Sequence, residues 1–128
     1  MPAPRPALAS LLTALLTALL VGHAAACGDP CTNTERARVR SPDGRREAVV
    51  FGRACGAKTG VSAQVALVAP GERAVGVGNV FAAERDVPVA VRWEGATTLV
   101  VRYRGAGEVG TRPQIDDVRL RYDSLDVP

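Results

Sequence analysis

The chain has 128 residues, a length that fits one small domain. Its formal charge of +3 at pH 7 is only a mild excess, so we expect no nucleic-acid partner. The only histidine, His23, lies in an apolar N-terminal stretch. The rest of the chain therefore offers no Ser–His or Cys–His dyad and no histidine ligand for zinc. We expect neither a metal nor a cofactor.

Residues 1–26 have the three-part pattern of a signal peptide. Arg5 supplies the positive start, and residues 7–21 form an apolar run rich in leucine and alanine. Ala24-Ala25-Ala26 then provides the small residues of a cleavage site. The apolar run is shorter than the roughly 18 to 20 residues that a membrane-spanning helix needs. The sequence therefore predicts an exported protein.

Cys27 follows the predicted cleavage site directly. Cleavage after Ala26 would make it the first residue of the mature chain, where a bacterial lipoprotein carries its diacylglyceryl group. We therefore predict lipidation of Cys27 and, through it, anchoring to a membrane of the bacterial envelope. The same alanine triplet also suits ordinary signal peptidase, so an unlipidated periplasmic or secreted protein is the alternative.

The chain has three cysteines, and an odd number in an exported protein leaves one thiol to be explained. If Cys27 is lipidated, Cys31 and Cys55 remain as a disulfide pair. That pair would close a loop of about 24 residues, with a stabilisation of very roughly 3 kcal/mol from chain entropy. Pairing of Cys27 with Cys55, or of Cys27 with Cys31, is also compatible with the sequence.

The exported part reads as short strands separated by turns. Polar residues 27–35 predict a tether, and residues 36–128 predict one β-domain. Ser41-Pro42-Asp43-Gly44 predicts a tight turn, because Pro42 fixes φ and Gly44 accepts a positive φ. Apolar and β-branched stretches predict strands at 36–40, 47–52, 62–68, 79–82, 87–94, 97–104 and 118–122. No stretch has a sustained helical period, and residues 105–113 read as a loop. We expect an all-β fold: a small antiparallel sheet of about six to seven short strands, sandwich- or meander-like.

Part of this pattern resembles a known family. The residues that carry the likeness are Ser41 to Gly44, Ala48 to Phe51, Arg53, Cys55 to Ala57, Thr59, Gly60, Ser62, Gly78 to Phe81, and Val91 to Trp93. They resemble a group of small uncharacterised bacterial exported proteins, many of them lipoproteins. The chain departs from the family at Ala54, Lys58 and Val61, where the family has an acid, a threonine and an aromatic residue. The resemblance implies a fold and an envelope compartment, but no reaction.

Arginines recur at every second position in three stretches: Arg36, Arg38 and Arg40; Arg102 and Arg104; Arg119 and Arg121. Side chains two residues apart in a strand share one face of a sheet. If these strands are neighbours, the face could bind phosphate, an anionic glycan or anionic lipid headgroups. The candidate anion-binding residues are Arg102, Arg104, Arg119 and Arg121. The alternative is an ordinary solvated face, with the apolar residues between the arginines turned to the core.

The signals for catalysis are weak. Ser62 with Lys58 could form a dyad, and the Asp116–Asp117 pair could act with Glu94 as an acid/base site. The G-x-G-x-x-G stretch at 105–110 lacks the following helix of a nucleotide site, and we read it as a hairpin loop. The sequence favours a structural or binding role at the cell envelope, through exposed strand edges, the arginines, or Trp93 if it is exposed. The alternatives are a small periplasmic hydrolase and an inhibitor that inserts residues 105–113 into an enzyme.

Overall fold

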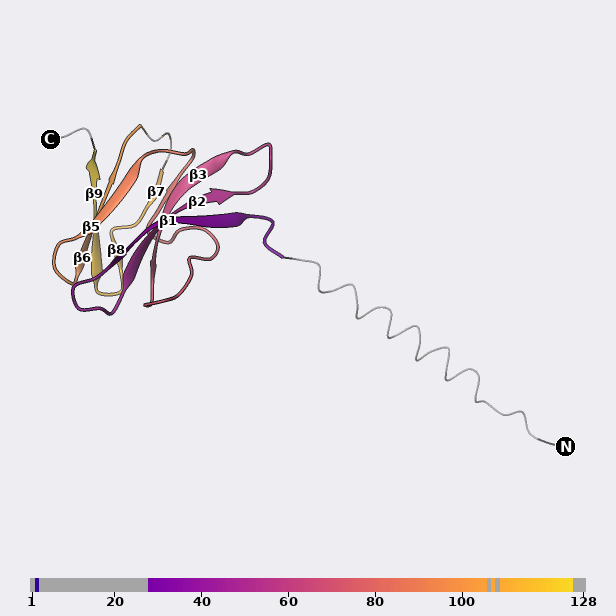
Figure 1. The fold of residues 1–128 in the computed structure, drawn as a ribbon, viewed down its shortest axis with the longest axis horizontal. Helices are drawn as coiled ribbons and strands as arrows, with labels where there is room; N and C mark the ends of the chain where they lie inside the picture. The colour runs from indigo at the N-terminus through magenta and orange to yellow at the C-terminus, as the bar shows by residue number, and fades with distance from the viewer. Residues whose placement is uncertain (1, 3–27, 106, 108, 126–128) are drawn as a thin grey trace.

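The structure is a computed structural model, which describes residues 2, 28–105, 107 and 109–125. The predicted signal peptide and the lipidation of Cys27 lie outside these residues. The described part of the chain contains nine strands and no helix, which confirms the predicted all-β class (Figure 1). No helix in this part is long and apolar enough to span a membrane.

The strands form two sheets. Their bounds are β1 Thr32–Arg40, β2 Glu47–Ala54, β3 Val61–Val68, β4 Phe81–Ala83, β5 Val89–Trp93, β6 Thr98–Tyr103, β7 Val109–Thr111, β8 Gln114–Ile115 and β9 Val118–Ser124. Sheet A has the order β1-β2-β3-β4-β7 with antiparallel neighbours. Sheet B has the order β5-β6-β9-β8, in which only the β6–β9 pair is parallel.

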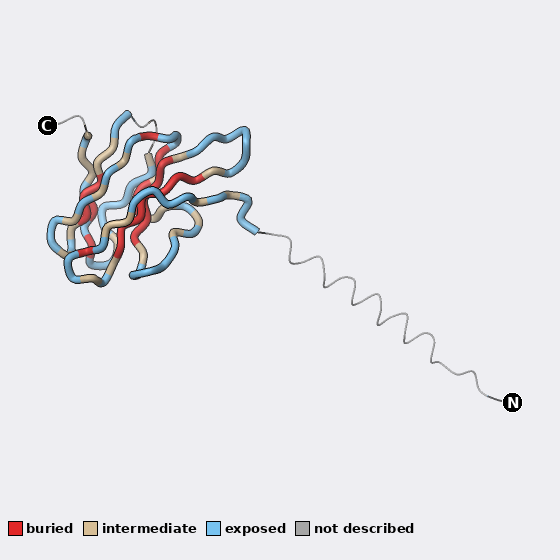
Figure 2. Tube along the Cα trace, viewed as in Figure 1, coloured by how far each residue is buried: buried red, intermediate tan, exposed pale blue. Residues whose placement is uncertain are grey.

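The two sheets pack face to face as a sandwich. One hydrophobic cluster joins Val50, Val65 and Phe81 of sheet A to Leu99 and Val101 of sheet B. Figure 2 shows the buried residues gathered in the middle of the domain, with exposed residues along the loops and on the strand segments that project furthest toward the N-terminus. Alternating side chains of strands from both sheets supply this core, as expected for a β-sandwich.

A second, smaller cluster lies on the outer face of sheet A. Val49, Phe51 and Ala66 point away from the main core, yet each is at least 95% buried. Residues 69–79, between β3 and β4, cover them, and Ala74 packs on this cluster. Both faces of β2 are therefore buried, which explains its nearly continuous apolar sequence. We call residues 69–79 the covering loop.

The predicted turn at residues 41–44 is present. The Gly44 nitrogen donates to the Ser41 carbonyl at 2.9 Å, and Gly44 has φ of 71°. The Ser41 hydroxyl donates to the Asp43 carboxylate at 2.6 Å and accepts from the Arg46 nitrogen at 3.1 Å. Glycine adopts such a φ without the strain that a Cβ atom adds, so Gly44 favours a turn at the point where β1 ends and β2 begins.

A disulfide joins Cys31 to Cys55 at one end of the sandwich. This is the pairing predicted for a chain in which Cys27 is lipidated. It continues the β1–β2 ladder, whose last pair is Thr32 with Ala54. The first strand begins at Thr32, so residues 32–35, predicted as part of a tether, belong to the domain instead. A register shift between Glu35 and Ala37 hides this strand from a pattern search, because it breaks the period of two.

The stretch predicted as one loop, 105–113, contains an additional strand. β7 pairs with β4 and extends sheet A, so this part of the chain crosses from one sheet to the other. The still shorter β8 follows and forms a hairpin with β9. Strands of two or three residues carry too few side chains for alternation to show in the sequence.

Candidate functional site

The outer face of sheet B carries arginines from three neighbouring strands. Arg92 of β5 and Arg121 of β9 lie opposite Val100 of β6 on either side. Arg119 lies opposite Thr98, and Arg102 is the next outward residue of β6 after Val100. Arg104 follows just beyond the strand, where its nitrogen continues the ladder by donating to the Pro88 carbonyl at 3.3 Å. We call Arg92, Arg102, Arg104, Arg119 and Arg121 the arginine face.

Val100 lies in the middle of this face and is fully buried. Its neighbours on the inward side of β6, Leu99 and Val101, belong to the main core, whereas Val100 points the other way. Since Arg92 and Arg121 flank it in register, their aliphatic stems cover it while their guanidinium groups reach water. Arg92 and Arg121 are further positioned by their ion pairs with Glu94.

Two carboxylates balance part of this charge. Glu94 accepts two hydrogen bonds from Arg121, at 2.7 and 2.9 Å, and one from Arg92 at 2.9 Å. The hydrogen bonds from Arg121 hold the pKa of Glu94 below its ordinary value. Asp123 accepts from Arg121 at 3.4 Å. Among the described residues, the outward positions of β5, β6 and β9 themselves carry four arginines and one acid, Asp123, while Glu94 directly follows β5 and Arg104 directly follows β6.

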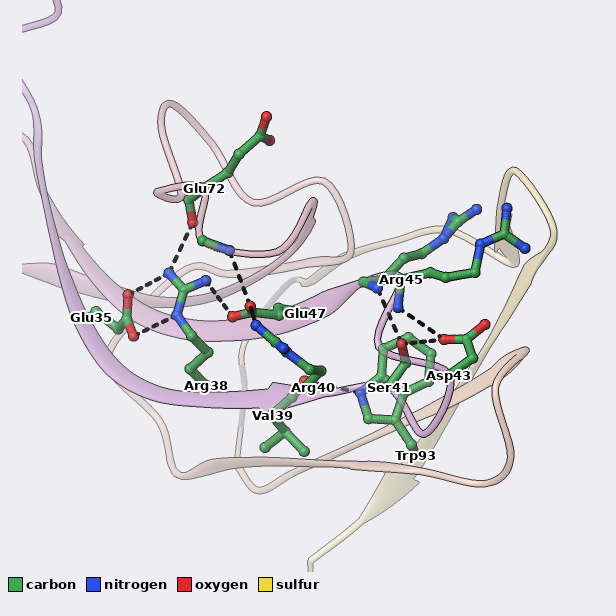
Figure 3. Close-up of polar contacts among 12 residues, drawn as sticks. Glu35, Arg38, Val39, Arg40, Ser41, Asp43, Arg45, Glu47, Glu72 and Trp93 are labelled. Carbon is green, nitrogen blue, oxygen red and sulfur yellow. Dashed lines mark hydrogen bonds and ion pairs between the residues drawn. The ribbon is translucent and has the colours of Figure 1, made fainter.

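The arginine stretch in β1 lies in the other sheet, and its side chains form ion pairs that stabilise the fold. Arg36 forms a two-bond ion pair with Asp86, at 2.6 and 3.0 Å. Arg38 donates to Glu35, to Glu47 and to the Glu72 carbonyl (Figure 3). These contacts neutralise the β1 arginines. Only the stretches on β6 and β9 come together on one face, because these two strands are adjacent and parallel.

Glu47 is the centre of the β1 network. Its side chain is 4% exposed and accepts from Arg38 at 2.7 Å, from Arg40 at 3.0 Å and from the Gly71 nitrogen at 3.1 Å. The hydrogen bond from Arg38 is the main cause that lowers the pKa of Glu47 to about 2. Glu47 thus links the covering loop to the start of β2. Its hydrogen bonds go to β1 arginines and to the loop backbone, so we assign it a structural role.

Trp93 is half-buried and packs against the main core. Its indole nitrogen donates to the Val39 carbonyl at 3.0 Å, which links the edge of sheet B to β1 of sheet A. This hydrogen bond satisfies the only polar atom of the indole. Trp93 therefore closes one side of the sandwich, and we do not assign it to a binding surface.

A groove that no sequence pattern predicted lies beside the covering loop. Asp29, Asn33, Phe51, Arg53 and residues 73–76 line it, with a volume of about 550 Å³. Arg53 is 9% exposed and donates to Asp29 and to the Asn33 side-chain oxygen at 2.8 Å. In residues 74–78 valine alternates with alanine or glycine, a local pattern that gives no sign that this stretch covers a sheet.

The residues weighed for catalysis are not brought together. Asp116 and Asp117 form the β8–β9 turn and pair with Arg46, whereas Glu94 pairs with arginines of sheet B. The lowered pKa of Glu94 keeps it ionised, which is the wrong state for a general acid. Ser62 accepts a hydrogen bond from Gln64 at 2.7 Å, and Lys58 lies in the exposed turn after Cys55. No group of three or more His, Cys, Asp or Glu side chains in the described ranges could hold a metal ion.

Comparison of the chain with protein-family models, with curated proteins and with solved structures gives no match.

Proposed function

We propose that this protein is an exported bacterial envelope protein, anchored through a lipid on Cys27, which binds an anionic ligand on the arginine face. The observation that carries the binding proposal is the gathering of five arginines around Val100, on three neighbouring strands of one sheet face and just beyond one of them, with Glu94 and Asp123 paired to Arg92 and Arg121. Guanidinium groups suit phosphate, sulfate and carboxylate ligands because they donate two parallel hydrogen bonds.

The compartment is supported by the cysteines and by the N-terminal sequence. A disulfide between Cys31 and Cys55 favours an oxidising environment, such as the outside of the cytoplasmic membrane. With these two cysteines paired, Cys27 is the remaining thiol and stands at the predicted cleavage site. The resemblance to small exported proteins and lipoproteins, carried by the Cys55 loop among other residues, agrees with this location.

The binding proposal predicts salt-sensitive affinity for a polyanion. We expect the purified domain to bind polyphosphate and heparin fragments, used as probes, with affinity that falls as ionic strength rises from about 0.01 to 0.15 M. The double variant Arg102→Glu/Arg119→Glu should lower this affinity by about tenfold or more, equivalent to about 1.4 kcal/mol or more. Calorimetry or fluorescence anisotropy measures both effects.

The matched control is Arg45→Glu/Arg112→Glu, because both residues are exposed and lie outside the arginine face. It changes the net charge by the same amount, so it should leave most of the affinity intact. Equal loss in the two double variants would mean that only net charge matters. Absence of binding by the unmodified domain would refute the anion-binding proposal.

A further inference from the structure

The covering loop presents two exposed apolar side chains. Val75 is 81% exposed and Val77 is 63% exposed, the highest values among the large hydrophobic residues of the described chain. Arg73, also exposed, comes just before them. Exposed valines next to an arginine form a small amphipathic tip, which suits the boundary between lipid and water.

The chain enters the domain beside this tip, and it does so at a fixed point. Asp29 accepts hydrogen bonds from Arg53 at 3.1 and 2.9 Å and from the Cys31 nitrogen at 3.0 Å. Cys31 is further fixed by its disulfide to Cys55. Only Gly28 separates Asp29 from Cys27 in the sequence, and two residues of fully extended chain span at most about 7 Å. A lipid on Cys27 would leave almost no tether.

The loop and this fixed point are connected. The Asn33 side chain accepts from Arg53 and donates to the carbonyls of Ala74 and Gly76, at 3.0 and 2.9 Å. Asp29 and Val75 also line the same groove. The tip therefore holds a set position next to the residue that would carry the anchor.

We propose that Val75 and Val77 insert into the surface of the membrane that holds Cys27, with Arg73 at the level of the lipid headgroups. This inference rests on the proposed lipid anchor. The occupant of the apolar tip is the anchoring membrane because a two-residue link leaves the tip within reach of that surface. The arginine face then stays available to the envelope space, since β5, β6 and β9 lie on the side of the domain away from residues 28–31 (Figure 1).

Depth-dependent fluorescence quenching tests this orientation. The mature lipidated protein, with its acyl mass verified, is reconstituted in phosphatidylcholine–phosphatidylglycerol vesicles whose acyl chains carry bromine. In Val75→Trp, the added indole should sit about 5–10 Å into the interface and lose at least about twofold more emission than the protein with Trp93 alone. The matched variant Ala90→Trp, on the outer face of sheet B, should show only the Trp93 background. Val77→Trp serves if Val75→Trp does not fold.

Each outcome is decisive. Acylated protein with unquenched tryptophan at both loop positions would overturn insertion and leave the anchor standing. Quenching at position 90 and not at position 75 would mean that the arginine face lies on the membrane, which also overturns the proposal. Protein from bacterial membranes that lacks acyl mass on Cys27 would refute the anchor, and the insertion proposal with it.

Discussion

Glu47 shows how one buried carboxylate organises several segments of this protein. It receives hydrogen bonds from two β1 arginines and from the backbone of the covering loop. Removing one member of a buried charged network leaves its partners buried without a counter-charge. This destabilises the fold more than replacing the whole network with apolar side chains. The strength of this network depends on Glu47 being ionised.

The stability of the protein should therefore fall in acid partly through Glu47. The pKa of this carboxyl is lowered from its ordinary 4.5 to about 2, so its contribution is complete above about pH 5. The contribution is lost as the pH falls through 4.5 toward 2 and below, because Glu47 is then protonated in the folded as well as in the unfolded chain. We expect Glu47→Gln to unfold at lower urea than the unmodified protein at pH 6, and the difference to vanish near pH 2.

Glu72→Gln is the matched control for this experiment. Glu72 is exposed on the same loop, and only its backbone carbonyl contacts Arg38. A pH dependence of stability that is the same in Glu47→Gln as in the unmodified protein would show that Glu47 does not titrate as we describe.

At the scale of elements, the disulfide determines how the N-terminal half of β1 is held. The bond closes a loop of 24 residues, which corresponds to a stabilisation of about 3 kcal/mol. We expect Cys31→Ser/Cys55→Ser to lower the free energy of unfolding by roughly that amount in urea titrations. Hydrogen exchange should also rise first at Thr32–Glu35 and at Arg53 and Ala54. A double variant as stable as the parent would contradict this role.

The strands that were predictable from the sequence are those with strong alternation or a long apolar run. β2, β3, β5, β6 and β9 meet that condition, and each lies within about two residues of its predicted bounds. The start of β1 was missed because Thr32–Glu35 is polar and a bulge follows it. β7 was missed because its pairing with β4 is decided by tertiary contact and not by its own three residues.

The arginine spacing predicts which arginines of one strand share a face, but it does not predict which strands are neighbours. Period-two spacing correctly predicts that Arg102 shares a face with Arg104, and Arg119 with Arg121. It does not tell which strands are neighbours, and β1 turned out to lie in the other sheet, with its arginines neutralised by Glu35, Glu47 and Asp86. Ion pairs between residues 50 apart, such as Arg36 with Asp86, have no local signal in a sequence.

At the scale of the whole molecule, the domain has two different ends. Asp29, Cys31 of the disulfide and Val75 of the covering loop line one groove, whereas the strands of the arginine face belong to the other sheet. This arrangement is compatible with the membrane-anchored binding protein that we propose. We propose that the arginine face, and not the end that carries the covering loop, binds the anionic ligand.

The most direct test is a map of the binding surface by NMR. The isotope-labelled domain is titrated with a short polyphosphate while backbone amide shifts are recorded. We predict that the largest shifts occur on β5, β6 and β9 around Arg92, Val100 and Arg119, and that they shrink in 0.5 M salt. Shifts confined to β1 or to the groove beside the covering loop, or none at all, would contradict the assignment of the arginine face as the binding site.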